Sequence, residues 1–401
     1  MEKNKNVPEI RFEGFEDEWS YVSLGELMNE KNILTSDFSK YPIYSLTIEE
    51  GITPKTKRYE RGFLITKTTD LFKVVHPDEF VTNPMNLRFG ALGYNNNDYS
   101  VSVSGYYDVF SIDENECSNF WNWYFKTFTA WLKFNKVATG SLLEKRRVKF
   151  SNLQELRFKV PTDSREKLKI GSYLEKYSDL TINQKEKYEK LLDLKKSMLY
   201  KLFPKEGETT PEIRFDGFNG NWQKKKLGDC FSERAESYPE GELLSVTINQ
   251  GIKKFSDLDR KNNSNENKSK YKKVYVGDIA YNSMRMWQGA SGYSPYEGIV
   301  SPAYTVLNPN EGIDSKCFSY LFKRTDIIHM FQIYSKGITS DNWNLKYPDF
   351  KELEVYVSPD YNEQKAIGEY FSKLDKLIEL NKDKLEKLKN IKSSLLNKMF
   401  V

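Results

Sequence analysis

The sequence PEIRFEGFEDEW at residues 8–19 returns almost unchanged as PEIRFDGFNGNW at residues 211–222, half a chain later. The similarity continues beyond this opening, since YSLTIEEGI (44–52) corresponds to LSVTINQGI (244–252). A chain of 401 residues that repeats itself in this way predicts two similar domains in one polypeptide. Such a pseudo-dimer suits a ligand that itself has two halves.

The composition is that of a folded protein with nearly balanced charge. Hydrophobic residues make up 38% of the chain, which is enough for sizeable cores. Lys and Arg number 61 against 57 Asp and Glu, so any basic surface must come from local segregation of charge. Aromatic residues reach 14%, and their rings either fill β-rich cores or face a partner.

Several classes of protein do not fit this composition. The three scattered cysteines, Cys117, Cys230 and Cys317, argue against a disulfide framework and for a reducing compartment. Two histidines, His76 and His329, cannot supply a Cys/His metal site. The N-terminus lacks an apolar core and no run approaches the ~18 apolar residues of a membrane span. We therefore expect a cytoplasmic protein without a metal site.

Each half begins with strand-like sequence and ends in a long helical segment. Asp163 with Glu166, and Asp360 with Glu363, have the spacing of a capping box at the start of these helices. The expected domains are residues 1–162, helix 163–204, residues 205–359 and helix 360–401.

Both helical segments carry a heptad seam that predicts a coiled coil between them. The seam positions, most of them apolar, are Ile170, Leu174, Tyr177, Thr181, Gln184, Tyr188, Leu191, Lys195, Met198 and Leu202, and then Ile367, Phe371, Leu374, Ile378, Asn381, Leu385, Leu388, Lys392, Leu395 and Met399. An antiparallel pair is favoured because a globular domain separates the two helices in the chain. The alternative is two amphipathic helices, each packed on its own domain.

Two polar seam residues, Gln184 and Asn381, lie midway along their helices and are expected to meet and fix the register. A parallel pair would also oppose them, so they do not decide the direction. Five apolar residues outside the seam could bind a partner: Leu180, Leu192, Leu194, Leu377 and Ile391.

Basic, polar segments follow the repeated TIxxGI sequence in both halves, at residues 53–62 and 253–273. Such segments contact phosphates and become ordered on binding, although a solvated loop has the same composition. The candidate phosphate-binding residues are Lys55, Lys57, Arg58, Lys67, Lys268, Lys270 and Lys272.

The next matched pair, NPMNLRFGALGY (83–94) and YNSMRMWQGASGY (281–293), keeps its glycines and changes its polar residues. Asn86 stands opposite Arg285, and Arg88 opposite Trp287. Asn hydrogen-bonds adenine and Arg guanine in the major groove, so the segments are expected to contact different bases. The candidates are Asn83, Asn86, Arg88, Tyr94, Asn282, Arg285, Trp287 and Tyr293, with Arg146 and Asn342 from a weaker loop pair. Met85, Met284 and the glycines are expected to be core and turn residues.

The sequence lacks the catalytic motifs of common ATP-dependent and methyltransferase enzymes. No GxxxxGK[ST] phosphate loop and no methyltransferase motif pair occur. Pro359-Asp360 with Glu363-Gln364-Lys365 is similar to a nuclease motif, but its acids are too close in sequence to come from separate strands around one metal. We therefore expect no catalytic residues, no metal and no directly bound cofactor.

These motifs resemble the specificity subunits of Type I restriction-modification systems across both halves: PEIRF…GF…W…LG, NSMR-x-W-x-G-A-S-G-Y, and the tails EKYEKLLDLKKSMLYKLF (186–203) and DKLEKLKNIKSSLLNKMF (383–400). The resemblance implies an internally duplicated α+β fold, with two α/β target recognition domains separated by an antiparallel coiled coil. It implies a subunit that is not an enzyme. Each domain would bind one half of an asymmetric double-stranded DNA site, and the coiled coil would set the gap.

The same resemblance implies the partners. Two methyltransferase subunits would use S-adenosylmethionine, and restriction subunits would use ATP and Mg²⁺. Two other functions remain open: an autonomous nuclease or methyltransferase with an unrecognised motif, and a helical scaffold that binds only protein.

Overall fold

The computed structural model describes residues 6–48, 51–55, 71–113, 115–141, 146–248, 251–259, 261 and 264–401. Lys57, Arg58 and Lys67 lie outside these residues. The chain forms two compact units. Unit 1 comprises Met1–Lys185 and Asp383–Val401, and unit 2 comprises Glu186–Lys382. Each unit therefore contains one part of helix α5 (Ser164–Lys201) and one part of helix α10 (Tyr361–Lys398).

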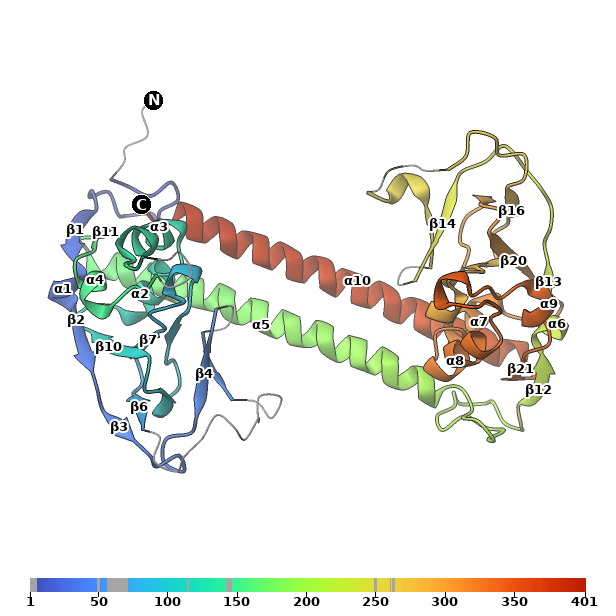
Figure 1. Ribbon diagram of the computed structural model, residues 1–401, viewed down its shortest axis with the longest axis horizontal. Helices are drawn as coiled ribbons and strands as arrows, with labels where there is room; N and C mark the ends of the chain where they lie inside the picture. Colours follow the sequence, from blue (N-terminus) through green and yellow to red (C-terminus); the bar gives the residue numbers. More distant parts are fainter. Residues whose placement is uncertain are drawn as a thin grey trace. The chain divides into compact units, whose positions relative to one another are not determined.

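Unit 1 is built on small antiparallel sheets covered by short helices (Figure 1). Its largest sheet has the order β2 (Met28–Lys31), β10 (Asp108–Ile112), β7 (Phe80–Thr82) and β8 (Leu92–Tyr94). The other strands are β3 (Leu34–Thr35), β6 (Phe72–Val75) and β9 (Val101–Ser104), the hairpin β4 (Tyr44–Thr47) and β5 (Gly51–Pro54), and the pair β1 (Ser20–Ser23) and β11 (Arg157–Val160). The short helices are α1 (Leu24–Leu27), η2 (Leu87–Phe89), α2 (Ser118–Tyr124), α3 (Phe128–Val137) and α4 (Phe150–Gln154).

Unit 2 repeats this topology, except that a two-stranded pair replaces the three-stranded sheet of unit 1. Its four-stranded sheet has the order β13 (Phe231–Glu233), β20 (Tyr304–Pro309), β17 (Ile279–Asn282) and β18 (Ser291–Tyr293). The pairs are β14 (Leu244–Thr247) with β15 (Gly251–Lys254), β16 (Lys272–Val274) with β19 (Gly298–Val300), and β12 (Gln223–Lys226) with β21 (Glu354–Val357). The helices are α6 (Leu227–Cys230), η4 (Phe255–Asp257), η5 (Met286–Gln288), α7 (Ser315–Leu321), α8 (Thr325–Ile333), η6 (Ser340–Asn342) and α9 (Tyr347–Phe350).

Aromatic residues fill the main cores. The tryptophan that ends each repeated opening motif is almost completely buried, at 3% exposure for Trp19 and 4% for Trp222. Trp19 packs edge-on against Phe400 at 6.4 Å between ring centroids, and Trp222 against Phe203 at 6.0 Å. Phe203 lies two residues after the last residue of α5, and Phe400 two residues after that of α10. Each opening motif is therefore packed against the end of the long helix that comes from the other half of the chain.

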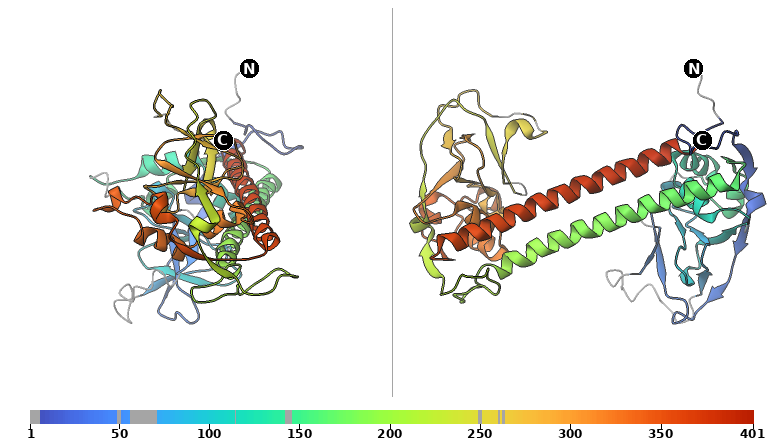
Figure 2. Two further views of the ribbon diagram at one scale, coloured as in Figure 1. Left: turned by 90° about the vertical axis from the view of Figure 1, so that its right-hand side faces the viewer. Right: turned by 180° about the vertical axis from the view of Figure 1, so that it is seen from behind.

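The two long helices pair antiparallel within each unit. In unit 1, Ile170 and Leu174 of α5 share a core cluster with Met399, and Lys392 Nζ donates to Ser178 Oγ at 3.0 Å. The beginning of α5 thus lies beside the end of α10, as the right-hand view of Figure 2 also shows.

In unit 2 the end of α5 lies beside the beginning of α10. Leu202 shares a cluster with Ile367 and Phe371, and Lys195 Nζ lies 2.5 Å from Asp375 Oδ1. All predicted seam positions are buried or half-buried, whereas Leu180, Leu192, Leu194 and Leu377 are exposed. The predicted duplicated α+β fold with an antiparallel helix pair is confirmed.

The amides predicted to set the register are both buried, Gln184 in unit 1 at 7% exposure and Asn381 in unit 2 at 6%. Asn381 Nδ2 donates to Leu377 O of its own helix at 2.6 Å. Their role in the register stays a prediction.

The predicted capping box is only half right. Asp163 Oδ1 and Asp360 Oδ1 each accept a backbone N–H two residues later, at 2.8 Å, as N-capping residues do. Glu166 and Glu363 instead accept from arginines of the repeated opening motif, Arg11 and Arg214. A buried carboxylate gains more from a bidentate guanidinium than from one backbone N–H, which explains the difference.

Among the described residues, no helix is both long enough and apolar enough to span a membrane. The described part of the chain also contains no group of three His, Cys, Asp or Glu side chains arranged to hold a metal ion.

Candidate nucleic-acid interface

The segments 83–94 and 281–293 adopt the same local structure, and their conserved residues build it. Asn83 Oδ1 accepts the backbone N–H of Met85, and Asn282 Oδ1 that of Met284, both at 3.0 Å. A short 3-10 helix follows and ends at a glycine with positive φ, 98° at Gly90 and 80° at Gly289. The side-chain oxygens of Asn83 and Asn282 are thus engaged in forming the turn.

The residues that differ between the two segments occupy equivalent, accessible positions. Asn86 precedes η2 with φ −112° and ψ 0°, and Arg285 precedes η5 with φ −130° and ψ 10°. Both side chains are exposed. The structure therefore presents an amide in unit 1 and a guanidinium in unit 2 from the same backbone frame.

The next pair of candidates is held by aromatic contacts. The Arg88 guanidinium lies over the Phe89 ring at 4.3 Å from its centroid. Trp287 Nε1 donates to Met284 O at 3.1 Å, and its ring packs edge-on against Trp343 at 5.2 Å. Both side chains are half-buried, so part of their surface remains accessible.

The repeated TIxxGI hairpin lies directly on each segment. A Cβ added to Gly292 of β18 would stand 2.7 Å from Gly251 Cα and 2.9 Å from Ile252 N, both backbone atoms of the β14–β15 hairpin. In unit 1, a Cβ on Gly93 would stand 2.8 Å from Leu46 Cδ1 and 3.0 Å from Ile52 N. Glycine is needed at both places because the hairpin approaches so closely.

The two tyrosines that end the segments are half-buried. The Tyr94 hydroxyl donates to Asp78 Oδ1, and burial together with this carboxylate raises the pKa of Tyr94. Lys316 Nζ lies over the Tyr293 ring at 5.2 Å, and burial raises the pKa of Tyr293 as well. Both remain neutral at physiological pH.

The basic candidates differ in accessibility. Lys270 and Arg146 are exposed, whereas Lys55 and Lys268 are half-buried. Lys272 Nζ lies 3.2 Å from Glu233 Oε1, an ion pair that offsets its charge. Lys270 is therefore better placed than Lys272 to contact a phosphate. The exposed Asn342 donates to Thr339 Oγ1 at 3.3 Å.

One residue that the sequence did not single out connects these parts in unit 2. Lys323, between α7 and α8, donates through Nζ to three backbone carbonyls: Ile248 O at 3.0 Å, Gly289 O at 2.6 Å and Ser291 O at 2.8 Å. Burial and the neighbouring Lys195 charge lower the pKa of Lys323 to about 8. Phe322-Lys323 corresponds to Phe125-Lys126 in the first half, but no local pattern indicates where the ammonium group lies.

The two lysines that interrupt the heptad seams contact side chains of the short helices in their own units. In unit 2, Lys195 pairs with Asp375, whose Oδ2 accepts from Tyr320 of α7 at 2.9 Å. In unit 1, Lys392 Nζ lies over the ring of Trp123 of α2 at 4.7 Å from its centroid, and burial lowers the pKa of Lys392. These polar seam positions therefore connect the long helices to the short helices α7 and α2 of the same unit.

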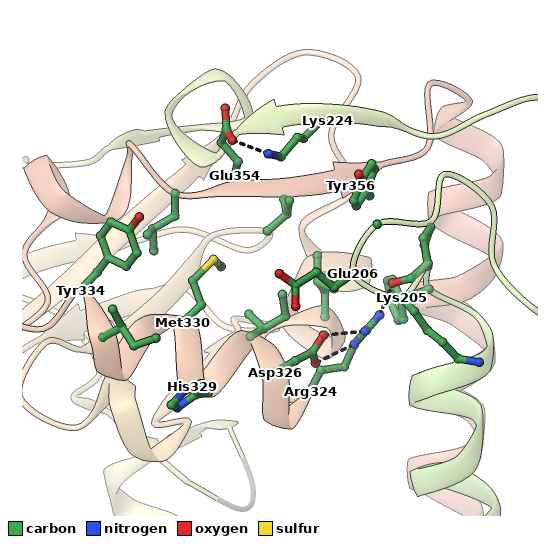
Figure 3. Close-up of a pocket in the computed structure, with 18 of the residues that line it drawn as sticks. Lys205, Glu206, Lys224, Arg324, Asp326, His329, Met330, Tyr334, Glu354 and Tyr356 are labelled. Carbon is green, nitrogen blue, oxygen red and sulfur yellow. Dashed lines mark hydrogen bonds and ion pairs between the residues drawn. The ribbon is translucent and has the colours of Figure 1, made fainter.

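A cavity of 640 Å³ lies between α8, the β12–β21 pair and the segment after α5 in unit 2 (Figure 3). Its charged side chains are largely paired, Arg324 with Asp326 at 2.6 Å and Lys224 with Glu354 at 2.7 Å. Arg324 Nη1 also donates to Pro204 O at 2.8 Å. The residues that line the cavity include none of the candidate DNA-binding residues, so we assign it no part in recognition.

Comparison with known proteins gives a consistent result. The sequence profile of a family described as "Type I restriction modification DNA specificity domain" matches residues 16–193 and again 219–390. The structure is similar to that of a Type I restriction-modification S subunit from M. genitalium, with a TM-score of 0.59 and 14% identity over 98% of this chain and 99% of that one. The HsdS subunit from Thermoanaerobacter tengcongensis aligns with a TM-score of 0.43 and 13% identity over 96% and 97% of the two chains. No curated protein matches the chain in sequence.

Proposed function

Because this chain belongs to the Type I restriction-modification DNA specificity family, we propose that each of its units binds one half of a bipartite, asymmetric double-stranded DNA site. Unit 1 takes one half-site and unit 2 the other. The chain itself catalyses no reaction and binds no cofactor.

The observation that carries the proposal is the difference between two equivalent positions. Asn86 and Arg285 precede equivalent 3-10 helices with similar backbone angles, and both are exposed. An amide is suited to adenine and a guanidinium to guanine in the major groove. The two half-sites should therefore differ in sequence.

Phosphate contacts come from the basic residues around these segments. Lys270 and Arg146 are exposed and are therefore the described candidates best placed for these contacts. Lys57, Arg58 and Lys67 are proposed for the same role on their sequence alone. Such contacts hold the protein on DNA without distinguishing sequences.

The long helices are proposed to set the gap between half-sites and to bind two methyltransferase subunits. Support comes from apolar side chains that lie outside the seam and remain exposed, at 46% for Leu180, 39% for Leu192, 43% for Leu194 and 42% for Leu377. Exposed apolar side chains on a helix suit contact with a protein partner. S-adenosylmethionine would then be used by the methyltransferase subunits, and ATP and Mg²⁺ by restriction subunits.

The test is to map methylated adenines in a host that carries this chain with methyltransferase subunits of the same system. We expect one asymmetric site with two specified parts and an unspecified gap. Replacing residues 282–293 by their unit 1 counterparts 83–94 should change one part only. A continuous or symmetric site would contradict the proposal, and so would methylation by the purified chain alone, which would favour an autonomous methyltransferase.

A further inference from the structure

Lys323 joins two segments of unit 2 that are far apart in sequence. Ile248 lies at the turn of the β14–β15 hairpin, while Gly289 and Ser291 lie where η5 passes into β18. All three carbonyl oxygens are within 3.0 Å of the same ammonium nitrogen. A protonated lysine has three N–H donors, so each can be used by one carbonyl.

The carbonyls that Lys323 binds belong to the frame of the candidate recognition segment. Gly289 ends η5 with φ 80°, and its N–H donates to Met286 O at 2.8 Å. Arg285 also accepts through its backbone oxygen from Gln288 and Ala290. A shift of Gly289 would therefore move the turn that carries Arg285 and Trp287.

The helix before Lys323, α7, contacts both long helices. Its Tyr320 donates to Asp375 of α10 at 2.9 Å. Asp375 is paired with Lys195 of α5 at 2.5 Å, and Lys195 Nζ lies over the Tyr320 ring at 5.6 Å from its centroid. The helix that precedes Lys323 is thus anchored to the helix pair, by contacts that do not involve the loops bound by the ammonium group.

We propose that Lys323 is a positioning residue for DNA recognition by unit 2, whose ammonium group joins the β14–β15 hairpin to the η5–β18 turn and so holds Arg285 and Trp287 in one orientation. The proposal rests on the proposed function and adds a residue to it. Lys323 touches no base in this arrangement, because its three donors are used by backbone carbonyls. Its effect is on selectivity at the second half-site.

The experiment uses the full chain and a library of random DNA duplexes, with bound duplexes recovered and sequenced. Lys323→Met keeps the length of the side chain and removes its donors. We expect it to lower the preference for the second half-site by about tenfold, the size of one base contact, and to leave the first half-site unchanged. Lys323→Arg, which keeps the charge and several donors, should restore most of the preference.

Lys126→Met is the matched control, because it removes the corresponding lysine of unit 1 and should leave the second half-site unaffected. Thermal unfolding of each variant identifies one that does not fold. In that case Lys323→Gln, which keeps two donors, replaces Lys323→Met and should give an intermediate loss.

Unchanged preference in the Met or Gln variant would overturn the proposal, and so would an equal loss at both half-sites or a failure of Lys323→Arg to restore selectivity. Failure of the proposed function gives a different result, since the unaltered chain would then select no bipartite site.

Discussion

Arg214 donates to both carboxylate oxygens of Glu363, through Nε at 2.6 Å and through Nη2 at 2.8 Å. Arg11 makes the same bidentate pair with Glu166, with both distances at 2.8 Å. Each pair connects the repeated opening motif of one half to the first turn of the helix that closes that half. Both glutamates are 1% exposed, so each buried carboxylate depends on its arginine to balance its charge.

Arg214→Ala should strongly destabilise unit 2, because it leaves the Glu363 carboxylate buried without its cation. Breaking a buried pair in this way costs about 3–5 kcal/mol in the free energy of unfolding. Urea unfolding measures the change. Arg165→Ala is the control, because Arg165 pairs with Asp163 at the surface and is 81% exposed. Its free energy of unfolding should not change, and a similar loss in both variants would contradict the argument.

Arg285→Ala should relax one base position of the second half-site. The expected loss of discrimination is about 1–3 kcal/mol, the value of a bidentate contact to a base. Binding to duplexes with each base substituted in turn measures it. Lys270→Ala should instead weaken all sequences alike and lower the salt dependence by about one unit. If Arg285→Ala acted equally on every sequence, Arg285 would be a phosphate contact.

Gly292→Ala should separate the β14–β15 hairpin from β18, because the new Cβ would stand 2.7 Å from Gly251 Cα. Backbone atoms cannot yield as a side chain can, so we expect a loss of about 1–3 kcal/mol in stability. Selectivity at the second half-site should fall with it. Gly93→Ala, the equivalent change in unit 1, should affect the first half-site only. A loss at the first half-site in Gly292→Ala, or at the second half-site in Gly93→Ala, would show that the hairpins do not act within their own units.

Raising the pH should have opposite effects on the stability of unit 2 and on its selectivity. The pKa of Lys323 is lowered to about 8 by burial and by Lys195 of α5, partly opposed by Asp375 of α10. Between about pH 8 and the ordinary lysine pKa of about 10.4, the unfolded chain binds more protons at this site than the folded chain. The contribution of this group to stability therefore rises with pH.

Selectivity at the second half-site should fall over the same range, since a neutral amine has two donors for three carbonyls. Binding selections at pH 7 and pH 9 measure the change. In Lys323→Arg the selectivity should not vary, because arginine keeps its proton. A pH dependence that persists in this variant would assign the effect to another group.

Adding one heptad to both α5 and α10 should lengthen the gap between half-sites. Seven helical residues add about 10.5 Å, which corresponds to about three base pairs of DNA. The half-site sequences should stay the same. Methylation mapping measures both, and an unchanged gap would refute the proposed role of the helices.

Much of the fold follows from patterns that lie along the chain. The duplication is visible in the opening motifs, and the heptad seam from Ile170 to Leu202 names side chains that are buried or half-buried in the structure. Periodicity is a property of the local backbone, so it can be recognised without knowing what packs against it. The equivalence of Asn86 and Arg285 is also a sequence result, because the matched glycines around them fix the alignment.

The sequence by itself determined the two similar units, the paired helices and the turns that present different side chains. Only the tertiary structure decided that Glu363 binds Arg214 and that Lys323 binds three carbonyls. These contacts join residues far apart in the chain, and long side chains reach several partners at nearly equal cost. Which partner they take depends on the surrounding packing, which no local pattern encodes.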